Sequence, residues 1–230
     1  MPDETPILPV TPDVAERIVK DIVRALGPGW AIMPLGGTAM GRLSARPAAT
    51  KDIDLVVVLV SEAGAKIPDF DALVKIAHQL AKDKSTIRPR SDHTSVELAY
   101  STTAGPVKLE LIRGRGAQGG YFVTRRVLEA AISQSTLRDG VFEMPPEALA
   151  FLKAWGAHDK MKLVAAGKDE RGYHADRERG FRRDVETIRR DMLDRGQVPR
   201  ASVQRAMLDA CGPDRQKAIG RILREAGWAT

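Results

Sequence analysis

The sequence is short of cysteine, of aromatic residues and of long apolar runs, and these shortages exclude several classes of protein. Cys211 is the only cysteine among 230 residues, so the chain has neither a disulfide framework nor a zinc site built on several thiolates. No apolar run approaches the roughly 18 residues that a membrane-spanning helix needs. The first ten residues lack the basic start and apolar stretch of a secretory signal. We therefore expect a cytoplasmic protein with no membrane partner.

Charge is distributed unevenly along the chain. Residues 1–150 hold 18 basic and 18 acidic side chains, whereas residues 151–230 hold 18 basic and 12 acidic ones. The net charge of +6 therefore arises in the last third, which indicates an anionic partner such as nucleotide phosphates or RNA; a solvated helical surface is the alternative. Few aromatics accompany the interleaved acids and bases of residues 168–200, so the sequence provides no evidence of a base-stacking platform.

The spacing of apolar residues predicts an α/β first half and a helical second half. Strands are expected over residues 31–35, 53–60, 94–100 and 107–112, the last two as an antiparallel hairpin, with a loop over 44–50. From about residue 121 the pattern is helical to the end, with long helices over 147–166 and 175–195 and short ones opened by Pro199 and Pro213. We expect two domains: a mixed sheet flanked by helices over residues 1–118, and an all-helical domain over 119–230.

Two carboxylates open the strongest predicted strand. Residues 53–60 (IDLVVVLV) are almost continuously apolar and rich in β-branched side chains, which is typical of a central strand covered on both faces. Side chains alternate along a strand, so Asp52 and Asp54 point to one face, about 7 Å apart, and Ile53 points to the other. Oxygen ligands of this kind suit magnesium, and two such carboxylates can straddle a pair of divalent ions.

A third carboxylate is expected on a neighbouring strand. Glu110, in VKLELI, and Glu97, in TSVELAY, are the two candidates. We favour Glu110 because its strand is the more apolar of the two and should therefore lie beside the strand of Asp52 and Asp54. The predicted metal and catalytic set is Asp52, Asp54 and Glu110.

A glycine pair precedes these carboxylates. Gly36 and Gly37 end the predicted strand 31–35, and Thr38 begins a predicted short helix that ends near residue 43. Glycine main chain can approach phosphate oxygens closely, and the amino end of a helix attracts negative charge. We expect Gly36, Gly37 and the Thr38 hydroxyl to bind nucleotide phosphates; an ordinary tight turn is the alternative for the glycines.

Gly-Gly-Thr, a spacer of about a dozen residues, Asp-x-Asp and a later carboxylate together resemble the DNA polymerase β-like nucleotidyltransferase superfamily. GGTAM and ATKDIDLVV resemble in particular the abortive-infection-type toxin nucleotidyltransferases (AbiEii-like). The similarity covers roughly residues 30–112. It implies a magnesium-dependent enzyme that moves a nucleoside monophosphate from an NTP to a hydroxyl acceptor. The implied acceptor is RNA or tRNA, within a toxin–antitoxin system whose antitoxin would be a protein partner.

The resemblance extends more loosely into the helical half. It implies that Lys153 contacts the nucleotide phosphates, that Asp184 orients that lysine or a nearby arginine, and that the helical domain closes a nucleotide cleft. The sequence departs from the commoner family pattern at Arg182 and Arg183 and in the polar insertion before them. A snorkelling lysine is the alternative for Lys153, and a surface role is the alternative for Asp184. For the whole chain the alternatives are a non-catalytic nucleotide-binding module and a transferase acting on a small molecule or protein.

Overall fold

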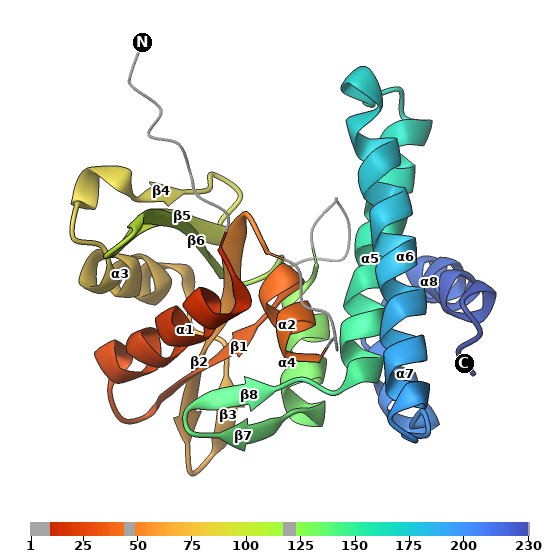
Figure 1. Ribbon diagram of the computed structural model, residues 1–230, viewed down its shortest axis with the longest axis horizontal. Helices are drawn as coiled ribbons and strands as arrows, with labels where there is room; N and C mark the ends of the chain where they lie inside the picture. The colour runs from red at the N-terminus through yellow and green to blue at the C-terminus, as the bar shows by residue number, and fades with distance from the viewer. Residues whose placement is uncertain (1–9, 44–48, 117–122, 230) are drawn as a thin grey trace. The chain divides into compact units, whose positions relative to one another are not determined.

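The computed structural model describes residues 10–43, 49–116 and 123–229 (Figure 1). The chain forms two compact units. The first holds residues 1–42, 46–113 and 137–143, and the second holds residues 43–45, 114–136 and 144–230. The loop expected over residues 44–50 lies largely outside the described residues. The expected α/β mixed sheet and C-terminal helical region are both confirmed.

An eight-stranded mixed sheet forms the first unit. Seven strands follow the order β4-β5-β6-β2-β1-β8-β7, and β3 pairs with β2. β1 and β2 are antiparallel, β2 and β6 are parallel, and β5 and β6 form the expected antiparallel hairpin. The strands are β1 (Trp30–Pro34), β2 (Asp52–Ser61), β3 (Gly64–Lys66), β4 (Arg88–Pro89), β5 (Ser95–Thr102), β6 (Gly105–Ile112), β7 (Thr136–Arg138) and β8 (Val141–Glu143).

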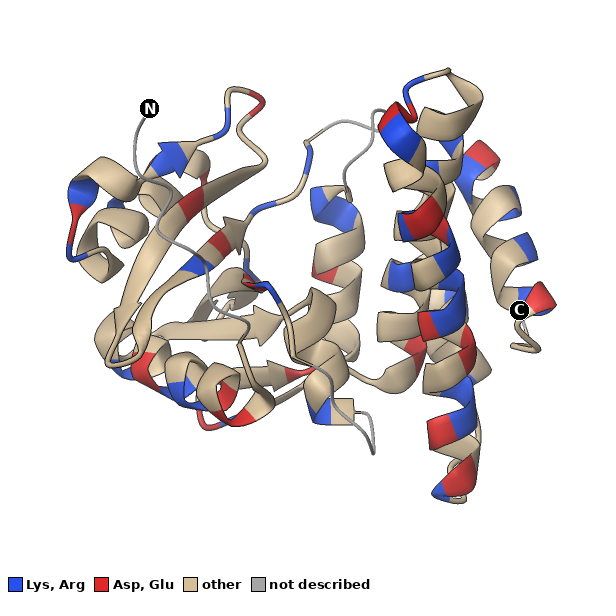
Figure 2. Cartoon of the chain, turned by 45° about the horizontal axis from the view of Figure 1, so that its top comes forward, with Lys and Arg blue, Asp and Glu red and all other residues tan. Residues whose placement is uncertain are grey.

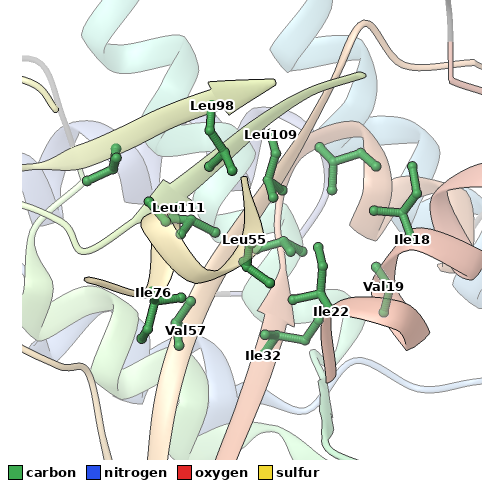
Figure 3. Packing of buried hydrophobic residues seen from close by; sticks show 14 of the residues in the cluster. Ile18, Val19, Ile22, Ile32, Leu55, Val57, Ile76, Leu98, Leu109 and Leu111 are labelled. Carbon is green, nitrogen blue, oxygen red and sulfur yellow. The ribbon is translucent and has the colours of Figure 1, made fainter. Parts of the chain in front are cut away.

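The central position of β2 follows from its composition. Leu55 and Val57 are fully buried on one face, and Val56 and Val58 are fully buried on the other, so the expected central strand with both faces covered is confirmed. Helices α1 (Pro12–Leu26) and α3 (Phe70–Leu80) pack their apolar stripes on the face that holds Leu55 (Figure 3). Each large apolar side chain buried in this core stabilises the fold by about 1.5–3 kcal/mol.

A short hairpin corrects the expectation that the chain stays helical after residue 121. β7 and β8 follow helix α4 (Arg125–Gln134), and β8 joins the sheet in parallel pairing with β1. Asp139 and Gly140, between the two strands, both have positive φ, 48° and 76°. Asp-Gly is the preferred pair for such a two-residue turn. The sequence therefore carried the signal, but strands of three residues are too short to show an alternating pattern.

The second unit is helical. Most residues in the first 14 positions of helix α5 (Pro146–Ala165) are buried, and α6 (Tyr173–Asp194) packs along it. Helices α7 (Ala201–Asp209) and α8 (Pro213–Glu225) also pack on α5. The expected long helices are confirmed to within two residues at each end. Among the described residues, no helix has the combination of length and apolar character that a bilayer crossing requires.

Four side chains form a buried polar cluster in this unit. Trp155 Nε1 donates to Asp159 Oδ2 at 2.9 Å, and Arg215 lies 3.5 Å from Asp159 Oδ1 and stacks over the Trp155 ring. Burial raises the pKa of Asp159 to about 6, although Arg215 opposes the shift. His158, only 5% exposed, has no hydrogen-bond partner for either ring nitrogen within the described chain. Burial, together with Lys162 and Arg215, lowers the pKa of His158 to about 4.

These two shifts predict opposite effects of acid on stability. The unfolded chain binds more protons than the folded chain at His158 between pH 6.5 and about 4, so this residue lowers the free energy of unfolding as the pH falls. Relative to the wild type, His158→Gln should therefore become more stable by up to about 3 kcal/mol as urea unfolding is moved from pH 7 to pH 4. Asp159→Asn should show the opposite trend. Between about pH 6 and pH 3.8 the folded chain binds more protons at Asp159 than the unfolded chain does, so the wild type gains stability from this residue in acid and the variant does not. A His158→Gln difference that does not change with pH would contradict this account.

Candidate functional site

The two predicted carboxylates lie at the start of β2. Asp52 and Asp54 are half-buried, while Ile53 between them is fully buried. This alternation places both carboxylates on the sheet face opposite the core that contains Leu55. Asp52 and Asp54 are therefore the charged residues of a strand that is otherwise largely apolar.

Glu110 lies beside this pair on the adjacent strand. The parallel register of β2 and β6 makes Asp54 and Glu110 Cα partners, and Asp52 and Lys108 form the pair two residues earlier. The expectation that the Glu110 strand neighbours β2 is confirmed. Directly opposed carboxylates repel one another, so this arrangement is unfavourable unless a cation or a proton compensates it.

Burial and a hydrogen bond have opposite effects on the pKa of Glu110. The Ser95 hydroxyl donates to Glu110 Oε1 at 2.6 Å. Burial raises the pKa of Glu110, and the nearby Glu97 and Asp52 add to the rise, while the Ser95 hydrogen bond and Lys108 oppose it. Ser95 itself is fully buried. Ser95 was not predicted from the sequence as a site residue, although the β5–β6 hairpin register places it on the same face as Glu97.

Glu97, the alternative third carboxylate, lies one strand further from Asp54. It is the Cα partner of Glu110 on the side away from β2. Its carboxylate pairs with Lys108, with 3.2 Å between Nζ and Oε2. Glu97 therefore already has a cationic partner, and Glu110 is the carboxylate adjacent to Asp54.

The glycine pair forms the first turn of helix α2 (Gly36–Leu43), which begins two residues earlier than expected. Gly36 has φ of 55°, and a Cβ atom there would lie only 2.3 Å from Asp54 Oδ2. The main-chain amide of Leu35 donates to the Asp54 carbonyl at 2.8 Å, which holds the turn against β2. The lack of a side chain at Gly36 therefore lets the amino end of α2 lie against the Asp54 carboxylate.

Thr38 faces a hollow between α1 and α2. Its side chain is 5% exposed, and within the described residues its hydroxyl has no hydrogen-bond partner. The hollow has a volume of about 300 Å³, and Gly37 and Thr50 also line it. Arg42, on the same rim, is held by Glu16 through contacts of 2.8–2.9 Å. An unsatisfied buried hydroxyl is costly, so Thr38 is available to a polar ligand that enters this hollow.

The predicted pair in the helical unit is in direct contact. Lys153 Nζ lies 2.6 Å from Asp184 Oδ2, and the lysine side chain is 9% exposed. The Phe181 ring lies 5.5 Å from the same ammonium. Acidic and basic side chains are interspersed along the rest of α6 (Figure 2). Lys153 is thus a buried, paired cation rather than a snorkelling side chain.

The carboxylate oxygens of the site are of the kind that magnesium prefers, although they do not lie close enough together to coordinate one ion. Within the described ranges, no group of three or more His, Cys, Asp or Glu side chains is close enough together to hold a metal ion. Asp52, Asp54 and Glu110 nevertheless share one face of two adjacent strands and offer only oxygen ligands, which magnesium prefers. No residue larger than glycine fits at position 36, beside the Asp54 carboxylate.

No protein-family model and no curated protein matches this sequence. Two solved structures from Helicobacter pylori are similar to it. One, described provisionally as a nucleotidyltransferase, is 15% identical, with 93% of this chain and 95% of that chain covered and a TM-score of 0.37. The other, JHP933, is 16% identical, with 94% and 93% covered and a TM-score of 0.37. At these identities a likeness concerns the fold alone, and at this TM-score it supports no argument about the site.

The contact between Gly36 and Asp54 can be tested by a double-mutant cycle. Gly36→Ala should lower the free energy of unfolding by about 2–4 kcal/mol, from positive-φ strain and from overpacking against the carboxylate. In an Asp54→Ala background the same change should cost only about 1–2 kcal/mol, the strain alone. Gly37→Ala is the matched control, because its Cβ would meet Thr50 instead, and its cost should be equal in both backgrounds. Equal costs for Gly36→Ala in the two backgrounds would contradict the contact.

Proposed function

We propose that this protein is a cytoplasmic, magnesium-dependent nucleotidyltransferase that moves a nucleoside monophosphate from an NTP to a hydroxyl acceptor. The observation that carries the proposal is the register that pairs Asp54 with Glu110 directly beside the amino end of α2. Carboxylates and a helix amino end in one place combine groups that suit a divalent cation with groups that suit phosphate.

In this proposal the carboxylates and the amino end of α2 have different tasks, and Glu110 has two. Asp52 and Asp54, with Glu110, would hold magnesium, which neutralises phosphate charge and favours in-line displacement at phosphorus. Gly36, Gly37 and Thr38 bind the phosphates through main-chain amides and a hydroxyl. Glu110 takes the proton of the acceptor hydroxyl; the new bond joins that oxygen to the α-phosphorus, and the bond to the departing pyrophosphate breaks.

The helical unit has a proposed phosphate-binding residue of its own. Lys153 contacts the nucleotide phosphates, and Asp184 fixes the position of its ammonium group. Support comes from the 2.6 Å contact between the two side chains and from the burial of the lysine. A charged group so placed is pre-organised and loses little side-chain freedom when it binds a ligand.

The acceptor and the biological role follow from the resemblance alone. We propose RNA or tRNA as the acceptor, and a toxin role in which a protein antitoxin restrains the enzyme. Growth arrest on expression, lost in Asp54→Ala, would support the toxin role. Normal growth at full expression of an enzyme active in vitro would contradict it.

The transfer reaction is tested with purified protein, each labelled NTP in turn, magnesium and total RNA. We expect labelled RNA and an equivalent release of pyrophosphate, and both should fall about a hundred- to a thousandfold in Asp52→Asn and Asp54→Asn. Asp71→Asn, at an exposed position on α3, is the matched control and should keep full activity. Transfer that survives both site variants would contradict the proposal. Binding of NTP and magnesium without pyrophosphate would indicate the alternative, a non-catalytic nucleotide-binding module.

A further inference from the structure

A second hollow in the first unit lies along the β5–β6 hairpin. Its volume is about 500 Å³, within the range of small-molecule sites. Its lining includes Arg88, Glu97, Ala99, Ser101, Pro106 and Lys108. The hollow is separate from the one beside Thr38, which lies between α1 and α2.

The strand residues of this hollow share a face with Glu110. In the hairpin register, Glu97 pairs with Glu110, Ala99 with Lys108, and Ser101 with Pro106. Paired residues and residues two apart lie on the same face of a sheet. The hollow therefore continues the face of Asp52, Asp54 and Glu110, toward the β4 side of the sheet.

Its position relative to Glu110 indicates a role. The amino end of α2 lies against Asp54 on β2, Glu110 follows on β6, and Glu97 follows on β5. In an in-line displacement the attacking oxygen and the leaving pyrophosphate are on opposite sides of the phosphorus. With the phosphates at α2, the acceptor approaches over β6 and β5. On the basis of the proposed function, we propose that this hollow is the acceptor subsite and that it takes a sugar ring with vicinal hydroxyl groups.

The chemistry of the inner end matches such a ring. Glu97 and Lys108 are 3.2 Å apart and each about one-third exposed. A half-exposed ion pair is worth little by itself, and both groups keep unused hydrogen-bonding capacity, the carboxylate as an acceptor and the ammonium as a donor. A vicinal diol both donates and accepts, so it can bind the two groups together. Ala99 and Pro106 offer an apolar strip for the C–H face of the ring.

The balance of charge argues against an anion or a cation as the bound group. Asp83 and Glu97 are matched by Arg88 and Lys108 among the lining residues, so the hollow has no net charge to attract an ion. An anionic group at its inner end would also lie close to Glu110, the strand partner of Glu97. A neutral polyhydroxyl ring avoids both penalties. Such a ring is supplied equally by the terminal ribose of RNA and by a free sugar.

Binding is tested without any need for catalysis. Methyl NMR signals of Ala99 and Thr86, which line the hollow, are followed while methyl β-D-ribofuranoside is added to the full-length protein. We expect saturable shifts in the wild type and in Lys108→Arg, and affinity at least tenfold weaker in Glu97→Gln and Lys108→Met. Lys66→Met, at an exposed position on β3, is the matched control and should bind as the wild type does. Absence of saturable shifts, or equal affinity in all variants, would overturn the subsite.

The source of the ring is tested by transfer. RNA that ends in a 2′-deoxynucleotide keeps its 3′ hydroxyl but lacks the vicinal diol, and it should be a much weaker acceptor than all-ribose RNA if terminal ribose is the natural occupant. A free sugar that is labelled while intact RNA is not would also support the subsite and identify a small-molecule acceptor. Equal labelling of the 2′-deoxy-ended and the all-ribose RNA at their 3′ ends would overturn it. If the proposed function is wrong but the subsite is right, the protein will neither bind NTP nor release pyrophosphate, and the sugar will still shift the methyl signals.

Discussion

The parallel pairing of β2 with β6 is the constraint on which the site depends. It makes Asp54 and Glu110 direct neighbours and places Lys108 beside Asp52. Because side chains alternate along a strand, this register exposes the carboxylates on one face while Leu55 and Leu111 enter the core on the other. A shift of one residue would bury carboxylates and expose leucines. The apolar core thus stabilises the position of the acidic groups.

Three surrounding features limit the cost of this arrangement. Ser95 hydrogen-bonds Glu110, Lys108 pairs with Glu97, and the amino end of α2 lies against Asp54. Each offsets part of the repulsion among the carboxylates. In the proposed function, a bound divalent cation and its phosphate substrate would offset more of this repulsion.

Much of this fold was predictable because its long elements have strong patterns. The β-branched run of residues 53–60 predicted a central strand, and the polar turn between residues 101 and 106 predicted the β5–β6 hairpin. The preference for Glu110 over Glu97 as the neighbour of Asp54 also followed from strand apolarity. The short β7–β8 hairpin was missed because three-residue strands show no periodicity. Ser95 and the contact between Gly36 and Asp54 were missed because they depend on register and on tertiary packing, which no single segment encodes.

The proposed divalent-cation site can be tested directly by paramagnetic broadening of backbone NMR signals by manganese, a substitute for magnesium, at low stoichiometry. The account predicts broadening concentrated at Gly36, Gly37, Asp52, Asp54 and Glu110, and its loss in the double variant Asp52→Asn with Asp54→Asn. Broadening centred elsewhere, or unchanged in the double variant, would contradict the assignment of a divalent-cation site to these two strands.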